Sequence, residues 1–269
     1  MRRLGVASIA CGLALLCAAA SAGAASLERC APQSTRARSL CGRVVVPLDR
    51  SGALPGTIGL RVRVLPALTP EPSGTVLALA GGPGQASARL LGVYAQLLAP
   101  ALRARQLVTF DQRGTGHSGR LDCPELAALP DDGAIAPDRA LENAVAGCAS
   151  RLGAARAHYA TADSVEDIEA VRAALGVERF ALFGISYGTK VALEYAAAYP
   201  QHVERLVLDS VVPLGGTDPF ARTTLGSIPR VLRSLCAHGA CPFTRDPAAD
   251  VAALAQRLAG APLHGAVID

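Results

Sequence analysis

Aromatic residues are scarce in this sequence: Phe, Trp and Tyr together make up 4% of it, and Trp is absent. Proteins that hold sugars or single-stranded nucleic acid on stacked rings need more aromatic side chains, so the composition excludes that class. Lysine occurs once, at Lys190, and the arginines that supply the other basic charges are scattered along the chain. Because the net charge of +4 comes without a basic cluster, we expect no nucleic-acid partner.

Metal-binding spacings are missing as well. The sequence has no C-x-x-C pair, and His238 lies too close to Cys236 and Cys241 to complete an ordinary ligand set. We therefore expect no metal. Hydrophobic residues make up 51% of the chain, which is enough for a sizeable core and excludes a disordered protein.

The first 25 residues are typical of a secretory signal peptide. Arg2 and Arg3 precede an uncharged apolar run from Leu4 to Ala20, and Ala22-Gly23-Ala24 is a suitable cleavage site. An uncleaved membrane anchor is the alternative, but the Ala- and Gly-rich composition and the cleavage site favour removal. We expect a secreted or periplasmic protein without stable membrane association.

Export changes the interpretation of the cysteines. The sequence has eight, of which Cys11 and Cys17 lie in the leader. The others form an even set in an oxidising compartment, which indicates disulfides. Pairing sequence neighbours, one of several possible arrangements, gives Cys30–Cys41, Cys123–Cys148 and Cys236–Cys241.

The strand pattern changes along the chain. Apolar residues at 42–49 and alternating residues at 58–64 predict an antiparallel hairpin. Short continuous apolar runs, separated mostly by helix-like segments, then predict buried parallel strands. These runs are Thr75–Ala80, Leu107–Phe110, Arg179–Gly184 and Leu206–Val212.

Two helices have recognisable ends. Ser164 and Asp167 form a potential capping box, and Gly176 stops that helix. The next helix runs from Tyr187 to about Tyr199 and is closed by Pro200. Helical content is also expected between Cys123 and His158.

The strongest functional motif is Gly184-Ile185-Ser186-Tyr187-Gly188, between a predicted strand and a predicted helix. A serine on such a sharp turn has its hydroxyl pushed clear of the sheet, and glycines on either side remove side chains that would clash. The helix N-terminus adds positive potential where an oxyanion forms. We predict that Ser186 is the nucleophile of an acyl-transfer enzyme; an ordinary serine at a helix start is the alternative.

An oxyanion also needs two amide donors. Tyr187 follows the nucleophile, and Gly81-Gly82-Pro83-Gly84 follows the strand that ends near Ala80. Pro83 has no N–H group, so Gly81, Gly82 or Gly84 would supply the second donor. A mere tight turn is the alternative interpretation.

The segment Asp111–Ser118 follows the next strand. Gly114, Gly116 and Gly119 match G-x-G-x-x-G formally, but no helix pattern begins there, so a dinucleotide-binding site is excluded. We interpret Asp111 and Arg113 as a charge pair that braces the loop.

These three motifs, in this order and spacing, resemble the proline iminopeptidase and tripeptidyl aminopeptidase family of serine peptidases, and the secreted tripeptidyl aminopeptidases in particular. The resemblance covers about residues 40–215. It implies an α/β-hydrolase fold, a peptide substrate with a free N-terminus, a serine triad and no cofactor. It also implies Ser186 as nucleophile with Gly82 and Tyr187 as oxyanion amides. Ala80 departs from the pattern, because proline iminopeptidases carry His there.

The end of the chain departs further. In this fold the triad acid and histidine usually follow the last two strands, whereas helical patterns at 219–235 and 250–258 begin a cap domain here. We therefore expect a C-terminally truncated chain that is inactive alone, with the triad Asp and His beyond residue 269. Within the chain, Asp209 is a candidate acid. The candidate bases, none in a usual position, are His202, His238 and His264.

The sequence thus predicts a signal peptide over 1–25, a mostly parallel α/β-hydrolase core over 26–212 and an incomplete helical cap over 213–269. The expected activity is that of an exopeptidase. Another secreted ester or amide hydrolase, or a non-catalytic protein of the same fold, are the alternatives.

Overall fold

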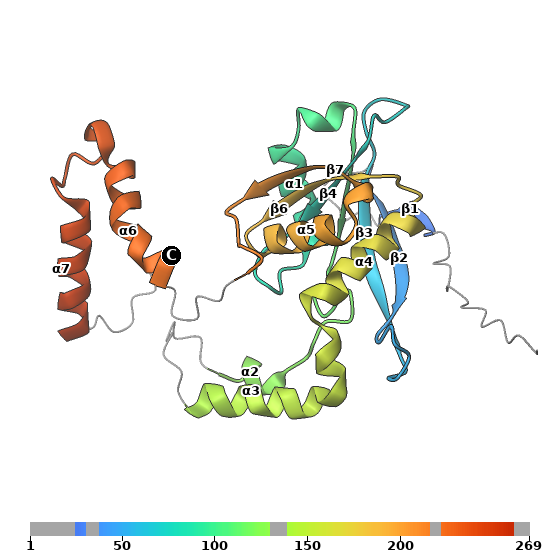
Figure 1. The fold of residues 1–269 in the computed structure, drawn as a ribbon, viewed down its shortest axis with the longest axis horizontal. Coiled ribbons are helices and arrows are strands. Elements are labelled where there is room, and N and C mark those ends of the chain that lie inside the picture. Colours follow the sequence, from blue (N-terminus) through green and yellow to red (C-terminus); the bar gives the residue numbers. More distant parts are fainter. Residues whose placement is uncertain (1–24, 31–37, 130–138, 216–221, 261–269) are drawn as a thin grey trace, which may run out of the picture. The chain divides into compact units, whose positions relative to one another are not determined.

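The computed structural model describes residues 25–30, 38–129, 139–215 and 222–260. The expected leader therefore lies outside the described residues, except for its last position. The chain, whose helices and strands are labelled in Figure 1, divides into two compact units, one from residues 1–122 and 152–212 and the other from residues 123–151 and 213–269.

A seven-stranded sheet in the order β1-β2-β3-β5-β4-β6-β7 forms the centre of the first unit. The β2/β3 hairpin is antiparallel, as predicted, while β5, β4, β6 and β7 are parallel. The strand β1 was not predicted, because its three residues carry no apolar pattern. The strands are β1 Leu27–Arg29, β2 Leu40–Pro47, β3 Thr57–Leu65, β4 Thr75–Leu79, β5 Gln106–Phe110, β6 Phe180–Ile185 and β7 Val203–Asp209.

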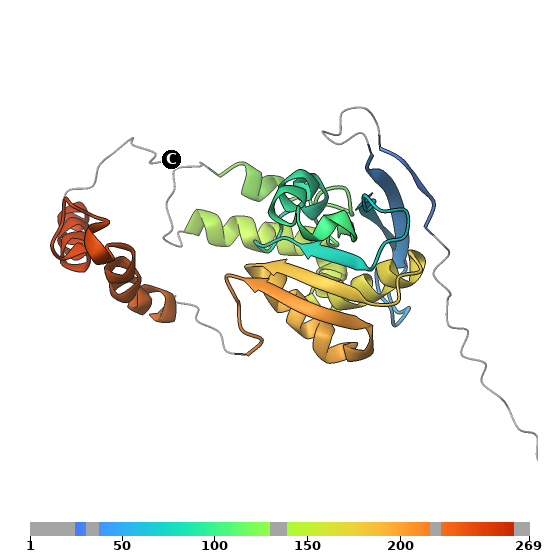
Figure 2. The same ribbon diagram turned by 90° about the horizontal axis from the view of Figure 1, so that it is seen from above.

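Helices cover both faces of this sheet (Figure 2). The helices α4 (Thr161–Ala174) and α5 (Tyr187–Ala198) bury their apolar side chains against one face. The short helices η1 (Ser87–Leu90) and α1 (Leu91–Leu97) lie on the other, where α1 packs on β4, β5 and β6. Both faces of β4 are consequently buried, which explains its continuous apolar run.

The start of α4 differs from the prediction. The helix begins at Thr161, and the Asp163 carboxylate accepts a hydrogen bond from the Ala160 N–H at 3.1 Å. Ser164 and Asp167 are therefore buried inside the helix and do not cap it. The predicted end is confirmed, since Gly176 adopts a φ of 64° just after the helix.

In the second unit, α2 (Pro124–Ala127) and α3 (Arg139–Leu152) are joined by Cys123–Cys148 and by an ion pair between Glu125 and Arg151. The helices α6 (Arg222–Leu235) and α7 (Pro247–Gly260) pack on each other. The connection between them contains η5 (Ala237–Gly239) and Cys236–Cys241. Both predicted C-terminal helices are thus present, although residues 219–221 lie outside the described part.

All three predicted disulfides are confirmed, with Cα–Cα distances of 5.0, 5.2 and 4.8 Å for Cys30–Cys41, Cys123–Cys148 and Cys236–Cys241. Among the residues that the structure describes, no helix has the length and apolar character needed to cross a membrane. In the same residues, no three His, Cys, Asp or Glu side chains are grouped so as to hold a metal ion.

Candidate active site

Ser186 occupies the turn between β6 and α5. Its φ and ψ are 53° and −123°, a strained conformation for a residue with a side chain. The Ser186 N–H donates a hydrogen bond of 2.9 Å to the carbonyl of Asp209 at the end of β7. The neighbouring strand therefore holds the backbone of the turn in place.

The two glycines of the motif lie where backbones meet. A Cβ atom on Gly184 would lie 2.6 Å from the Gly188 carbonyl oxygen, and one on Gly188 would lie 2.8 Å from the carbonyl oxygen of Ala80. Leu79 crowds Gly188 even more closely. The spacing of the motif thus follows from the close approach of β6, α5 and the end of β4.

The loop after β4 runs beside Ser186. Leu79 pairs with Gly184 in the parallel ladder, so both strands end at the same edge of the sheet. A Cβ atom on Gly81 would lie 2.9 Å from the Cβ and 3.4 Å from the Oγ of Ser186. The Ser87 hydroxyl accepts a hydrogen bond of 2.7 Å from the Ala80 N–H and thereby ties the two ends of the loop together.

Three hydroxyl groups position the elbow, which is the turn between β6 and α5 at Ser186, and none of them was predicted from the sequence. The Tyr187 and Thr161 hydroxyls are 2.9 Å apart, which joins α5 to the start of α4. The buried Thr189 hydroxyl donates to the Ser186 carbonyl at 2.6 Å and accepts from the Val212 N–H at 2.8 Å. The sequence offers one indication of the contact between Thr189 and the Ser186 carbonyl. Thr189 follows Ser186 by three residues, and a threonine hydroxyl in a helix can bind the carbonyl three or four residues before it.

The predicted pair between Asp111 and Arg113 is wrong, although both residues brace loops. The Asp111 carboxylate accepts backbone hydrogen bonds from Ala88 at 2.8 Å and His117 at 2.9 Å. Arg113 instead reaches α4, where it binds both carboxylate oxygens of Asp167 at 2.7 Å. The two side chains face different elements: the Asp111 carboxylate binds the backbone of η1, which follows the loop after β4, and the Arg113 guanidinium binds α4.

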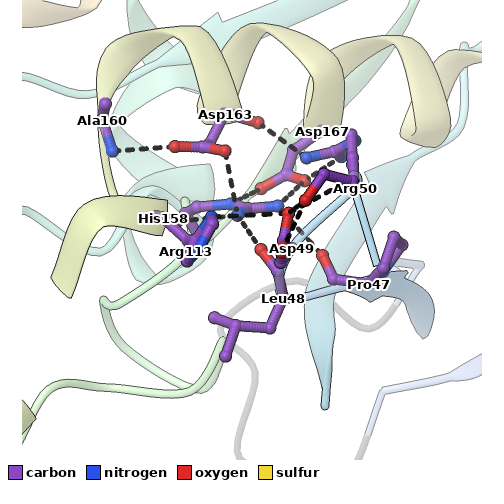
Figure 3. A network of polar contacts seen from close by, with 10 residues as sticks. Pro47, Leu48, Asp49, Arg50, Arg113, His158, Ala160, Asp163 and Asp167 are labelled. Atoms are coloured by element: carbon purple, nitrogen blue, oxygen red, sulfur yellow. Dashed lines mark hydrogen bonds and ion pairs between the residues drawn. The ribbon is translucent and has the colours of Figure 1, made fainter. Parts of the chain in front are cut away.

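Arg113 is the centre of a buried polar network (Figure 3). It also donates to the carbonyls of Leu48 at 3.0 Å and His158 at 2.7 Å. Burial disfavours the charged guanidinium, but the hydrogen bonds to Asp167 and the nearby carboxylates raise the pKa of Arg113 overall. The network therefore fixes the loop after β5 against α4 and against the end of β2.

Asp49 lies at the edge of this network, 3.8 Å from the His158 ring (Figure 3). Hydrogen bonds from Ser51 and Leu54 lower the pKa of Asp49 to about 2. Its carboxylate is thus occupied by the turn that follows β2, which is a structural role.

The candidate acid Asp209 and the candidate base His202 lie at opposite ends of β7. His202 precedes the strand and its Nδ1 is 3.0 Å from Glu169 of α4, whereas Asp209 ends the strand. The β6–β7 register pairs Phe180 with Val203 and Ile185 with Asp209. His202 is therefore separated from Ser186 by about 20 Å of strand.

The other candidate histidines have different positions. His238 belongs to the second unit, and His264 lies outside the described residues. Within the described part of the chain, no side chain forms a hydrogen bond to the Oγ of Ser186, and the Asp209 carboxylate is bound by the Ser210 hydroxyl at 2.9 Å.

The glycines of the G-x-G-x-x-G match form a tight turn. Gly114, Gly116 and Gly119 all have positive φ, at 78°, 49° and 65°. A Cβ on Gly116 would lie 2.8 Å from the Ala86 Cβ and would also strike Asp111. The next helix, α2, begins only at Pro124, so no helix N-terminus follows the turn as dinucleotide binding requires.

Known proteins share this sequence pattern. A sequence model described as the alpha/beta hydrolase fold matches residues 74–240. The chain is 31% identical to a tripeptidyl aminopeptidase of Streptomyces coelicolor over 75% of its own length and 40% of that protein. It is 28% identical to the serine protease Hip1 of Mycobacterium tuberculosis over 78% of its length and 44% of that protein.

A solved proline iminopeptidase-related protein from Thermus thermophilus is 28% identical and has a TM-score of 0.39, over 64% of this chain and 44% of that one. The chain thus spans less than half the length of these relatives.

Proposed function

Because the chain belongs to the α/β-hydrolase fold family, we propose that it is a serine hydrolase that removes residues or tripeptides from peptide N-termini. The observation that carries the proposal is the strained turn at Ser186, with a φ of 53° and the Gly81 loop beside it. The relatives named tripeptidyl aminopeptidase and serine protease support a peptide substrate.

In the proposed reaction, the Oγ of Ser186 attacks the carbonyl carbon of the scissile peptide bond. The hydroxyl proton passes to a general base and from there to the leaving amine. The Tyr187 and Gly82 amides donate to the oxyanion that forms at the carbonyl. Water then cleaves the ester on Ser186 and releases the N-terminal residues.

We also propose that the protein is exported and that this chain alone turns over peptide amides poorly. Export is supported by the leader pattern of the sequence and by the three disulfides. Poor turnover is supported by the position of His202, since a serine without a base stays protonated and is a weak nucleophile. Clear Ser186-dependent turnover would contradict this part and would place His238 or His264 at the site.

The test is covalent labelling, because it does not require turnover. A tripeptidyl fluorophosphonate with a free N-terminus forms an Oγ–P bond and releases fluoride. Because a serine without a base reacts slowly, the incubation is long; mass spectrometry should then find the adduct on Ser186 in the native chain and in Ser210→Ala, a matched serine at the end of the next strand, but not in Ser186→Ala. Labelling that survives in Ser186→Ala would refute the nucleophile.

The N-acetylated form of the same reagent tests the exopeptidase part. We expect it to label Ser186 about tenfold more slowly, because its amide cannot supply the ammonium that an N-terminal site binds. Equal labelling rates would reject specificity for free N-termini, and only the serine hydrolase part of the proposal would remain.

A further inference from the structure

A cleft of about 920 Å³ in the first unit is lined by basic side chains. Two come from β3, one from η1 and two from the loop after β5. They are Arg61, Arg63, Arg89, His117 and Arg120. The only carboxylate in the lining belongs to Asp111, and both of its oxygens accept backbone hydrogen bonds. The cleft therefore carries an excess of positive charge.

Side chains along β3 point alternately to the two faces of the sheet, and this alternation places the arginines in the cleft. Leu60, Val62 and Val64 point into the core beneath α4 and α5, so Arg61 and Arg63 project from the opposite face. Two arginines on one face of a strand repel each other. Burial lowers the pKa of Arg63, and the Arg61 charge lowers it further, while Asp111 partly opposes the change.

These arginines differ from others in the same unit. Arg105, Arg113 and Arg172 each bind a carboxylate at 2.6–2.7 Å. Among the described residues, none of the four cleft arginines forms such an ion pair. The Arg63 Nε is buried without a hydrogen-bond partner, and its other nitrogens donate to the Ala88 carbonyl and the Ser39 hydroxyl. Unpaired guanidinium groups around a hollow favour an anionic ligand.

The cleft opens close to Ser186. Gly84 lines it, and Gly81, three residues earlier in the same loop, lies against Ser186. Three residues span at most about 11 Å. A peptide whose carbonyl lies at Ser186 therefore reaches the cleft with the second to fourth residue from the scissile bond.

We propose that this cleft binds carboxylates of the leaving part of the peptide substrate, so that acidic residues shortly after the cleaved bond are preferred. The inference rests on the proposed function. The leaving side is indicated because the acyl side carries a free ammonium group, which the arginines would repel. A planar guanidinium binds a carboxylate through two parallel hydrogen bonds, which suits Asp, Glu and a C-terminal carboxylate alike.

Equilibrium binding of fluorescent hexapeptides tests the inference without turnover. One peptide carries Asp at positions 5 and 6, a second carries Asn there, and both have an amidated C-terminus. We expect the Asp peptide to bind about tenfold more tightly, with the difference reduced by salt. A third peptide, with Asn and a free C-terminal carboxylate, shows whether that carboxylate is also bound.

The variant Arg89→Gln/Arg120→Gln should lose most of the preference for Asp over Asn. Both side chains are exposed and donate no hydrogen bond to the described protein, so folding should be unchanged. Arg103→Gln is the matched control, an exposed arginine outside the cleft whose variant should keep the preference. Equal binding of the two peptides, or a preference that survives in the double variant, would overturn the inference.

The two proposals fail separately. Phosphonate labelling of Ser186 with no preference for Asp would reject the acidic-peptide cleft alone. A preference for Asp without labelling of Ser186 would reject the proposed reaction and leave a binding site for acidic peptides.

Discussion

At the scale of single residues, the elbow depends on side chains that are absent. Gly188 lies between the first turn of α5 and the end of β4, and the carbonyl oxygens of Leu79 and Ala80 occupy the space of a Cβ atom. Neither neighbour is a flexible side chain that moves away at low cost.

Gly188→Ala should therefore destabilise the first unit by about 1–3 kcal/mol, the usual cost of overpacking a buried site. Urea unfolding followed by circular dichroism measures the change. Gly226→Ala is the control: Gly226 lies in α6 with open space around it, so alanine should stabilise that helix by up to about 1 kcal/mol. Unchanged stability of Gly188→Ala would mean that the first turn of α5 moves away from the end of β4 at little cost.

At the scale of elements, the ion pair between Arg113 and Asp167 joins the loop after β5 to α4. Both side chains have no exposed surface, and Arg50 adds a second contact to Asp167 at 2.6 Å. A buried charge that loses its partner costs far more than the pair itself contributes.

We predict that Arg113→Met lowers the free energy of unfolding by about 3–5 kcal/mol. The double variant Arg113→Met/Asp167→Leu should recover much of this loss, since it removes both charges. Chemical unfolding of the two single variants and the double variant measures the coupling. Additive losses would show that Arg113 and Asp167 are not coupled energetically, and would contradict the prediction.

The elements also show what the sequence could predict. Strand and helix positions around Ser186 follow from continuous apolar runs and from Gly and Pro punctuation, which are local signals. The start of α4 does not, because Asp167 satisfies the capping pattern yet is held by Arg113, far away in the sequence. Likewise, one oxygen of the Asp111 carboxylate accepts a hydrogen bond from the Ala88 N–H of η1, which residue spacing alone does not reveal.

At the scale of the whole molecule, one surface ion pair should affect acid stability. Glu204 at the start of β7 binds Arg105, which precedes β5, through two hydrogen bonds of 2.6 and 2.7 Å. Arg105, with help from Arg205, lowers the pKa of Glu204 from its ordinary value of 4.5 to about 2. A depressed pKa means that the folded state favours the carboxylate, so this stability is present above pH 4.5 and is lost towards pH 2.

Glu204→Gln should accordingly lower stability at neutral pH and flatten the loss of stability between pH 4.5 and 2. The urea midpoints of the native chain and of Glu204→Gln, measured across this pH range, test the prediction. Glu178→Gln is the control, because its side chain is 91% exposed and its contact with Arg179 is 3.8 Å long. Identical acid profiles for Glu204→Gln and the native chain would exclude a contribution from the Glu204–Arg105 pair.

The hydroxyl of Thr189 makes the elbow part of the route by which the chain leaves the first unit. It is bonded to the Ser186 carbonyl on one side and to the Val212 N–H on the other, and Val212 is the last residue of that unit. One side chain therefore joins the backbone of Ser186 to the point at which the chain leaves the first unit.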